Sequence, residues 1–344
     1  MKVSVVMITY NHEKFIAQAI DSILMQEVKF DYEILIGEDC STDSTRDIVI
    51  DFQKRYSDKI RLLLPEKNLG VLKNLTTTLE ACRGEYIALL EGDDYWIDPY
   101  KLQTQVDILE SNAEVAIVGH RVQYWQEHSI DTVPAISPYE KPLGTLFDIL
   151  RRNYIPTCSA LIRKSALPNL VWFQDVVHGC KQADWPLWSF TAEKGDIVFL
   201  DKVMAVYRIH QGGVWSPLSM EEQLRWMYKA RKQVIVHLTN ISSVKRAEVW
   251  CHIYGEWGQM LYSANKYLLA VKYFVLALIS APWKALSILN LASSTFQWRN
   301  TLRLKRVADK ISALRNRVGK SLIRRSWGRL LISRVNVQNG NAKD

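Results

Sequence analysis

Residues 3–26, VSVVMITYNHEKFIAQAIDSILMQ, decide the fold class of this 344-residue chain. The first part, 3–9, is a continuous apolar run, as expected for a strand buried on both faces of a sheet. The second part, 13–26, carries apolar residues at helical spacing. A strand followed at once by a helix predicts the start of a βαβ unit.

The same alternation recurs through the first 120 residues. Apolar, strand-like runs are expected at 32–39, 59–66 and 85–92, and helices at 43–56 and 71–82. Ser41 or Thr42 can cap the helix that starts at Asp43. Repeated strand–helix units with short connectors predict an α/β fold with a mostly parallel sheet flanked by helices.

Composition and cysteine usage limit the class of protein. Apolar content of 48% and charged content of 23% are typical of a folded globular chain. Five cysteines without a CxxC pair indicate a reducing compartment and argue against a disulfide framework and a zinc site. Polar residues 11–14 interrupt any signal-peptide core, and Lys266 and Lys272 interrupt the apolar stretch 262–283. We therefore expect a cytoplasmic protein without a signal peptide or transmembrane helix.

Polar residues follow each of the four predicted strands. Each cluster alone suits an ordinary turn, but the carboxyl ends of parallel strands meet at one edge, where ligands bind. We favour one shared site. No G-x-G-x-x-G follows the first strand, which counts against a dinucleotide enzyme. A carboxylate-rich edge instead suits a diphosphate held through Mg²⁺ or Mn²⁺. The clusters are Thr9-Tyr10-Asn11, Glu38-Asp39, Asn68-Leu69-Gly70 and Glu91-Gly92-Asp93-Asp94.

Four motifs in this order resemble those of the family 2 glycosyltransferases, which have the Rossmann-like GT-A fold and use nucleotide sugars. The resemblance runs from residue 3 to about residue 216. It implies an inverting transfer of a sugar from a nucleoside-diphosphate sugar, most often a UDP-sugar, with Mn²⁺ or Mg²⁺ as cofactor. The motifs are SVVMITYNHEKFIAQAIDSILMQ, YEILIGEDCSTDST, NLGVLKNL and YIALLEGDDYW.

The resemblance assigns the nucleotide-sugar site to the strand ends. Asp39 would accept a hydrogen bond from the base, and the N-x-G segment supplies Asn68 and Gly70. Glu91 stands where many relatives have aspartate. The residues that would line the nucleoside pocket are Thr9, Tyr10 and Asn11.

Metal and diphosphate contacts are implied for two segments. Asp93 and Asp94 would bind the metal and the ribose–diphosphate region. In VYRIHQGGVWS (206–216), His210 would ligate the metal or contact the diphosphate. Arg208 would neutralise phosphate charge, and the Gly-Gly pair would let the loop close. A lone histidine is usually structural, and we interpret the six other histidines, His12 among them, in that way.

Asp184 in KQADWPLWSF (181–190) is the predicted catalytic base, because the segment resembles the family's Glu-Asp-Trp motif with Ala183 in place of glutamate. Asp184 can also cap the helix that starts at Trp185-Pro186, and both roles are compatible. Trp185 is predicted as a platform for the acceptor sugar, and Trp188 as a core residue.

The domain division follows these patterns. Residues 1–216 are the predicted GT-A domain, with a nucleotide-sugar half (1–120) and an acceptor half (121–216). Residues 217–298 form an all-helical extension with one tetratricopeptide-like helix pair in 260–282. The tail, 299–344, contains 13 Lys/Arg and 2 Asp/Glu.

Residues 299–335 have the pattern of a basic amphipathic helix. Such a helix suits an anionic membrane surface, with nucleic-acid binding and docking on the protein's own body as alternatives. We favour peripheral contact with the inner face of the cytoplasmic membrane and expect no nucleic acid. A lipid-linked glycan acceptor and a role in bacterial surface polysaccharide biosynthesis would fit this location.

Two other functions are alternatives to a sugar transferase. A catalytically inactive GT-A-like binding or scaffold protein is the alternative, although the presence of Asp39, Asp93, Asp94 and Asp184 speaks against it. A nucleotidyltransferase that makes the donor would need a glycine-rich N-terminal loop, which this sequence lacks.

Overall fold

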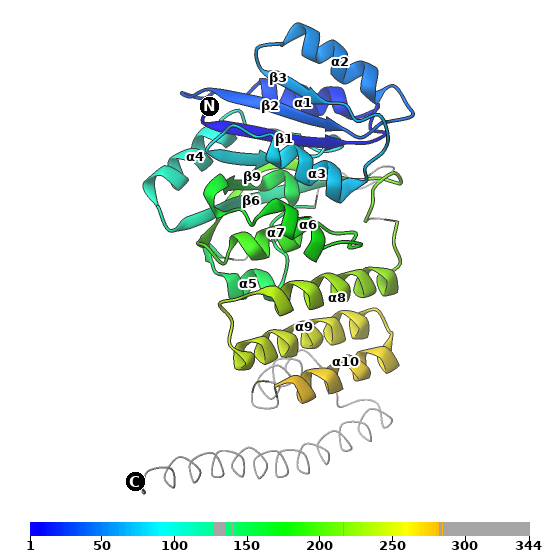
Figure 1. Cartoon of the computed structure of the whole chain (residues 1–344). Helices are drawn as coiled ribbons and strands as arrows, with labels where there is room; N and C mark the ends of the chain where they lie inside the picture. Colours follow the sequence, from blue (N-terminus) through cyan, green and yellow to red (C-terminus); the bar gives the residue numbers. More distant parts are fainter. Residues whose placement is uncertain (127–134, 139–140, 216, 282–283, 285–344) are drawn as a thin grey trace, which may run out of the picture. The chain divides into compact units, whose positions relative to one another are not determined.

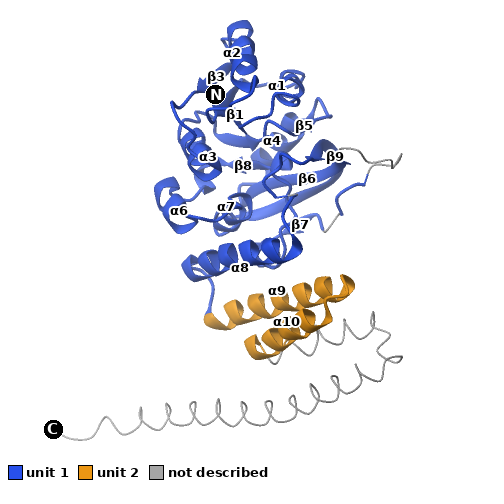
Figure 2. Ribbon diagram, turned by 90° about the vertical axis from the view of Figure 1, so that its right-hand side faces the viewer, with its two compact units in different colours: residues 1–242 blue, residues 243–344 orange. Residues whose placement is uncertain are grey.

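The chain divides into two compact units, Met1–Ser242 and Ser243–Asp344 (Figure 2). The predicted basic helix at 299–335 lies outside the described residues. Within the described part, no helix combines the length and apolar character needed to cross a membrane. The computed structural model describes residues 1–126, 135–138, 141–215, 217–281 and 284.

The four strands predicted in the first 120 residues are present and parallel, in the order β3-β2-β1-β4. The first three of this order are labelled in Figure 1. All seven residues of β2 are buried, because this strand lies inside the sheet and helices cover its faces. The continuous apolar runs of the sequence are explained by this two-sided burial. The strands are β1 (Val3–Thr9), β2 (Tyr32–Glu38), β3 (Ile60–Leu63) and β4 (Tyr86–Leu89).

Three helices connect these strands, as predicted. The first helix buries Ile16, Ala19, Ile20 and Ile23, the face that the helical spacing indicates. Each fully buried isoleucine contributes about 1.5–3 kcal/mol to folding. The helices are α1 (Ile16–Leu24), α2 (Thr45–Arg55) and α3 (Val71–Glu80).

The predicted cap of α2 is wrong. The helix begins at Thr45 with Ser44 in the N-cap position, and Asp43 Oδ1 accepts a hydrogen bond from the Thr45 amide at 2.9 Å. Ser41 Oγ instead accepts from the Asn11 amide at 2.9 Å, and the Thr42 amide donates to Asn11 Oδ1 at 2.8 Å. Both hydroxyl residues are therefore used to join two loops instead of starting the helix.

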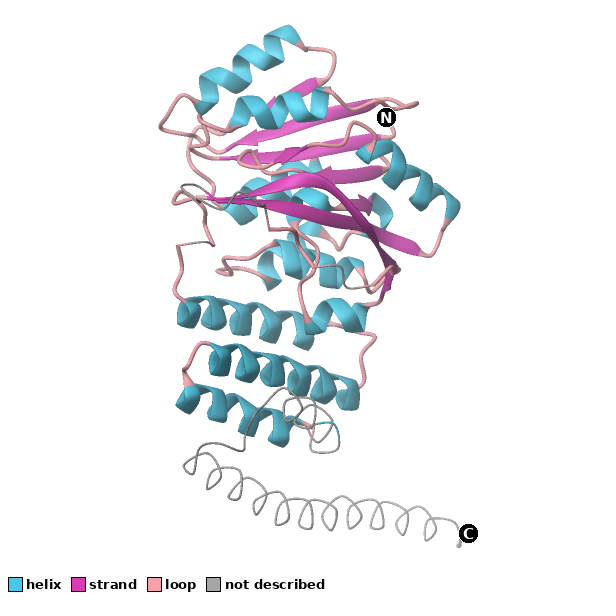
Figure 3. Cartoon of the chain, turned by 180° about the vertical axis from the view of Figure 1, so that it is seen from behind, coloured by secondary structure: helices cyan, strands magenta, loops and turns pink. Residues whose placement is uncertain are grey.

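The second half of the first unit extends the same sheet, whose full order is β3-β2-β1-β4-β8-β6-β9-β5, with β7 paired to β9. Strand β8 runs antiparallel to both β4 and β6, and β6 pairs in parallel with β9. Figure 3 shows helices flanking this mixed sheet, which confirms the predicted fold class. The added strands are β5 (Tyr95–Trp96), β6 (Val115–Gln126), β7 (Leu143–Gly144), β8 (Leu161–Arg163) and β9 (Asp196–Ile209).

The apolar segment 153–167 contains only one short strand, β8, which lies between two 3₁₀ turns, η1 (Thr157–Ser159) and η2 (Lys164–Ala166). The last helix of the first unit lies beyond residue 216, so this unit extends past the predicted end of the catalytic domain. The functional halves 1–120 and 121–216 stay a prediction. The helices are α4 (Lys101–Ser111), α5 (Leu146–Arg151), α6 (Leu170–Val176), α7 (Asp184–Thr191) and α8 (Met220–His237).

The described part of the second unit is a pair of helices, α9 (Ser243–Ser263) and α10 (Tyr267–Ser280). Gly258 lies against the Phe274 ring, and a Cβ atom there would lie 2.6 Å from a ring carbon. The close approach of the two helices therefore depends on glycine at this position. The helix–turn–helix predicted in 260–282 spans the end of α9, the turn and α10, and its tetratricopeptide character stays a prediction.

Candidate active site

The ends of β1 and β4 lie directly against each other. The Gly92 amide donates to the Ile8 carbonyl at 3.1 Å, and a Cβ atom on Gly92 would lie 2.5 Å from Thr9 Oγ1. Thr9 is buried, and its hydroxyl lies 3.2 Å from His12 Nδ1. The first and fourth polar clusters of the sequence are thus brought together, as the shared-site prediction requires.

Asp39 holds the third polar cluster, Asn68-Leu69-Gly70, in place through hydrogen bonds. Its two carboxylate oxygens accept hydrogen bonds from the amides of Leu69, at 2.7 Å, and Gly70, at 2.9 Å. Asn68 Nδ2 donates to the Asp39 carbonyl at 2.9 Å, and Gly70 has a φ of +81° that favours glycine. Asp39 lines a cavity of the first unit that Glu91, Asp93 and Asp184 also line. Asn68 and Gly70 are not among the described residues that line this cavity.

Asn11 joins two loops of this edge. Its φ is +56°, and its side-chain oxygen accepts from the Thr42 amide, so it orients the turn after β2. Thr9 and Tyr10 line the cavity, but Asn11 is not among the described lining residues. The structure therefore places two of the three predicted nucleoside-pocket residues at the cavity and gives the third a bridging position.

Asp93 lies between two imidazoles. Its Oδ2 is 3.1 Å from His210 Nε2 and 3.8 Å from His12 Nε2. Burial raises the pKa of Asp93, but the His210 hydrogen bond and the charges of the two histidines outweigh it and hold this pKa below its usual value. Burial lowers the pKa of His12, against the opposing charge of Asp93. The contacts with the two histidines thus favour the ionised form of Asp93.

Asp94 and Arg208 form a second buried contact. Asp94 Oδ1 accepts from the Arg208 amide at 2.8 Å, while its Oδ2 is buried without a hydrogen-bond partner among the described residues. Burial and the neighbouring Asp93 raise the pKa of Asp94 well above its usual range. A buried carboxylate oxygen without a donor is costly, so it marks a position that a bound cation or donor would stabilise.

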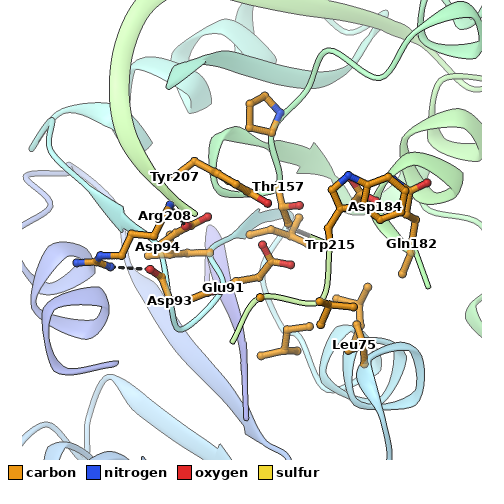
Figure 4. A pocket seen from close by; sticks show the side chains of 18 of the residues that line it. Leu75, Glu91, Asp93, Asp94, Thr157, Gln182, Asp184, Tyr207, Arg208 and Trp215 are labelled. Carbon is orange, nitrogen blue, oxygen red and sulfur yellow. Dashed lines mark hydrogen bonds between the residues drawn. The ribbon is translucent and has the colours of Figure 1, made fainter. Parts of the chain in front are cut away.

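Arg208 is buried and lines the cavity, and protein groups hold its guanidinium in place. It donates to the Asp93 carbonyl at 2.6 Å and lies over the Tyr95 ring, 4.3 Å from the centroid. Figure 4 shows the Asp93 contact as a dashed line. Arg208 therefore joins the end of β9 to the turn after β4, and its predicted phosphate contact stays a prediction.

Glu91 points into the same cavity (Figure 4). Burial raises its pKa well above the usual range, and the charges of Asp93, Asp94 and Asp184 raise it further. Glu91 thus interacts electrostatically with the two aspartates that follow it in the chain and with Asp184 from α7. The longer side chain found here in place of aspartate still reaches the site.

Asp184 is the first residue of α7 and follows the N-cap Ala183, so the predicted N-cap role of Asp184 is wrong by one position. Its Oδ2 accepts a hydrogen bond from Asn153 Nδ2 at 2.9 Å. Burial raises the pKa of Asp184, against the opposing hydrogen bonds from the backbone of Trp185 and from Asn153. A carboxylate with a raised pKa is a stronger proton acceptor.

Most of these residues line one cavity of about 520 Å³, a size typical of small-ligand sites. His210, like Asn11, Asn68 and Gly70, is not among its described lining residues. Both halves of the first unit contribute to it. The predicted site residues that line it are Thr9, Tyr10, Asp39, Glu91, Asp93, Asp94, Asp184 and Arg208. Further lining residues that the sequence did not single out include His12, Asn153, Thr157, Lys181, Tyr207 and Trp215.

Two tryptophan positions differ from the expectation. Trp185 is only 1% exposed, and its indole nitrogen donates to the Ile149 carbonyl at 2.6 Å, so it cannot be a sugar platform. Trp188 is fully buried, as predicted. Trp215 lines the cavity instead. The only feature of the sequence that could have indicated this is its place just after the Gly-Gly pair.

The side chains around Asp93 can be compared with the ligands that the Mg²⁺ or Mn²⁺ ion implied by the fold would need. No group of three His, Cys, Asp or Glu side chains in the described ranges is arranged to hold a metal ion. The Asp93–His210 pair and the unpaired Asp94 oxygen nevertheless fit Mg²⁺ or Mn²⁺, which take one or two protein ligands and fill the remainder with phosphate oxygens and water. His12 is a further nitrogen beside Asp93.

Comparison with known proteins gives consistent matches. The family model "Glycosyl transferase family 2" matches residues 4–170. The putative glycosyltransferase EpsE of Bacillus subtilis is 31% identical over 196 residues, which are 56% of this chain and 68% of that protein. An uncharacterized protein of Mycobacterium tuberculosis is 36% identical over 65% of this chain, and the match spans only 63% of that relative's length.

A more distant relative and a solved structure extend these matches. The UDP-Glc:alpha-D-GlcNAc-diphosphoundecaprenol beta-1,3-glucosyltransferase WfgD of Escherichia coli is 26% identical over 65% of this chain and 83% of that protein. The crystal structure of residues 1–349 of S. aureus TarS in complex with UDP-GlcNAc has a TM-score of 0.60, with 18% identity and 84% coverage of both chains. At this identity the likeness is one of fold.

Proposed function

The chain belongs to glycosyltransferase family 2, and we propose that it transfers a sugar from a nucleoside-diphosphate sugar to a hydroxyl of a glycan or lipid-linked glycan, with inversion at the anomeric carbon. One observation supports the proposal most strongly: Asp93 and Asp94, which follow β4, and Asp184, at the start of α7, line the same cavity. An inverting transfer needs a leaving-group site and a base at the same reacting centre.

The nucleoside would lie against Thr9, Tyr10 and Asp39, at the carboxyl ends of β1 and β2. Both Asp39 carboxylate oxygens already accept hydrogen bonds from backbone amides. Each oxygen keeps a further lone pair that can accept a hydrogen bond from an N–H group of the nucleobase. A UDP-sugar is the favoured donor, supported by the E. coli relative that is named for UDP-Glc.

Mn²⁺ or Mg²⁺ would be held by Asp93 and His210, with the Asp94 oxygen beside them. When bound, the cation would supply positive charge to the diphosphate as it leaves the sugar. Arg208 holds the Asp93 carbonyl and so keeps this turn in place.

Asp184 would accept the proton from the acceptor hydroxyl while that oxygen bonds to the anomeric carbon. The bond from this carbon to the diphosphate oxygen breaks at the same time, and the nucleoside diphosphate leaves with its electron pair. The raised pKa of Asp184 makes its carboxylate a stronger proton acceptor. Trp215 offers an aromatic face to the sugars.

For the acceptor, we propose a lipid-linked glycan at an anionic membrane surface, in bacterial surface polysaccharide biosynthesis. The basic pattern of 299–335 supports membrane contact, and the E. coli relative is named for a diphosphoundecaprenol acceptor. Cosedimentation with phosphatidylglycerol vesicles should be lost on deletion of 299–344. Unchanged cosedimentation of the truncated chain would contradict the membrane contact.

Donor hydrolysis tests the transferase. Purified protein is given UDP-, GDP- and dTDP-sugars with Mn²⁺ or Mg²⁺, and the released nucleoside diphosphate is measured. We expect metal-dependent release from one donor, which is lost in an Asp93→Ala/Asp94→Ala variant. No release from any donor, together with no nucleotide binding by calorimetry, would reject the transferase in favour of the inactive scaffold.

A further inference from the structure

A hydrogen bond joins two segments of the cavity wall that are 31 residues apart. Asn153 Nδ2 donates to Asp184 Oδ2 at 2.9 Å, and both residues line the cavity. Asn153 follows α5, and Asp184 begins α7. The Asp184 carboxylate is therefore held from outside its own helix by Asn153, and from within the helix by the backbone amide of Trp185.

The orientation of the Asn153 amide is determined by its second partner. The Ile155 amide points at Asn153 Oδ1, at 3.4 Å, which leaves the NH₂ group for Asp184. A flipped amide would place two acceptors against each other and two donors against each other, and both pairs repel. The observed orientation is the one that satisfies both neighbours.

The helix that begins with Asp184 is held against α5, the helix that precedes Asn153. Thr145 and Asp148 form a capping box at the start of α5, and the buried Trp185 beside Asp184 donates to the Ile149 carbonyl at 2.6 Å. The helices α5 and α7 are thus fixed to each other at the point where the Asn153–Asp184 contact occurs. A site residue on rigid elements keeps its geometry to a fraction of an ångström.

We propose that Asn153 is a positioning residue that holds Oδ2 of Asp184 and leaves Oδ1 to receive the acceptor's proton. This inference rests on the proposed function, in which Asp184 is the base. An amide NH₂ has no proton-accepting role, so Asn153 donates to Oδ2 both before and after Oδ1 is protonated. The proton therefore moves to one defined oxygen of the carboxylate.

The other charged groups around Asp184 have a different position and effect. Arg231 of α8 lowers the pKa of Asp184 through its charge. The charge of Asp184 in turn raises the pKa of Glu91, which follows β4. The Arg231 guanidinium lies over the Trp185 ring, 4.7 Å from the centroid. The hydrogen bond from Asn153 orients one particular oxygen of Asp184. The charge of Arg231 shifts the pKa of the whole carboxyl group without selecting an oxygen.

The first test needs no substrate. The side-chain carboxyl carbons of aspartate are labelled with ¹³C, the Asp184 signal is assigned with an Asp184→Asn variant, and it is titrated in the wild type and in Asn153→Ala. Loss of a hydrogen bond to the ionised form should raise the pKa of Asp184. Asn153→Asp, of nearly the same size, should raise it further because it adds a like charge. Asn240→Ala is the matched control, since Asn240 is exposed and is not a described lining residue.

The second test measures turnover. Hydrolysis of UDP-glucose and UDP-N-acetylglucosamine with Mn²⁺ is followed against pH for the same variants. We expect Asn153→Ala to lower kcat about 10- to 100-fold, with little change in the donor KM, and to move the acid limb of the profile to higher pH. An unchanged Asp184 pKa or an unmoved acid limb in both Asn153 variants would overturn the inference. Full activity of Asp184→Asn would instead reject Asp184 as the base, and the carboxyl titration distinguishes the two failures.

Discussion

His210 Nε2 lies 3.1 Å from Asp93 Oδ2, although the two residues are 117 positions apart in the chain. We therefore expect His210→Ala to raise the Mn²⁺ concentration for half-maximal donor hydrolysis about 10- to 100-fold, the range seen when a metal site loses a supporting group. The measurement is hydrolysis against Mn²⁺ at fixed donor. His178→Ala is the control, since His178 is exposed and is not a described lining residue. An unchanged Mn²⁺ dependence in His210→Ala would reject His210 as a ligand.

Asp39 is predicted to be both a structural and a nucleotide-binding residue. In Asp39→Asn, one oxygen that accepts from Leu69 or Gly70 becomes an NH₂ group facing an amide N–H. The half-buried amide that faces the NH₂ group loses its bond to Asp39, so the free energy of unfolding should fall by about 1 kcal/mol. Thermal melting and UDP calorimetry measure the two effects, with Asp58→Asn, at an exposed aspartate, as the control. Wild-type melting and wild-type UDP affinity in Asp39→Asn would contradict both roles.

Trp185 and Trp215 provide a matched pair of substitutions. Trp185 is buried, so Trp185→Ala should lower the free energy of unfolding by about 3–5 kcal/mol. Trp215 lines the cavity, so Trp215→Ala should keep the melting temperature and raise the acceptor KM. Thermal melting and transfer kinetics on both variants test this division. A large loss of stability in Trp215→Ala, with unchanged kinetics, would remove the sugar-platform role.

The strands and helices of the first half could be predicted from the sequence, because each has a single strong signal. The apolar run of β1 and the spacing of Ile16, Ala19 and Ile20 in α1 depend only on which faces are buried. The start of α2 was predicted wrongly because Ser41, Thr42 and Ser44 all suit an N-cap. Only the position of Asn11, distant in sequence, decides among them.

The site was predicted less completely, because several of its contacts join distant segments. His12 was interpreted as structural, yet it lies 3.8 Å from Asp93, and nothing near His12 in the sequence indicates this pairing. The sequence also gave no signal for Asn153, whose partner Asp184 lies on another helix. Trp185 was assigned to sugar binding because it follows the predicted base, but its indole faces α5 and the core.

Lys101 gives the clearest expectation for pH dependence of stability. It is fully buried in α4, where Nζ donates to Gln105 Oε1 at 2.8 Å and lies 4.1 Å from the Trp96 ring centroid. Burial lowers the pKa of Lys101 from 10.5 to about 7, against the opposing charges of Cys158 and Asp98. Above pH 7 the unfolded chain therefore binds more protons at this residue than the folded chain does.

Because the unfolded state holds the extra proton, this residue makes the free energy of unfolding rise with pH, by about 2 kcal/mol between pH 7 and pH 9. Lys101→Met removes the titrating group and should remove this part of the rise. Urea unfolding of both proteins at pH 7 and pH 9 measures the difference, in which the other titrating groups cancel. Gln105 loses one partner in the variant at either pH, a pH-independent cost of about 1 kcal/mol. Equal pH dependence in the two proteins would show that Lys101 keeps an ordinary pKa, with its charge stabilised by the contacts to Gln105 and Trp96.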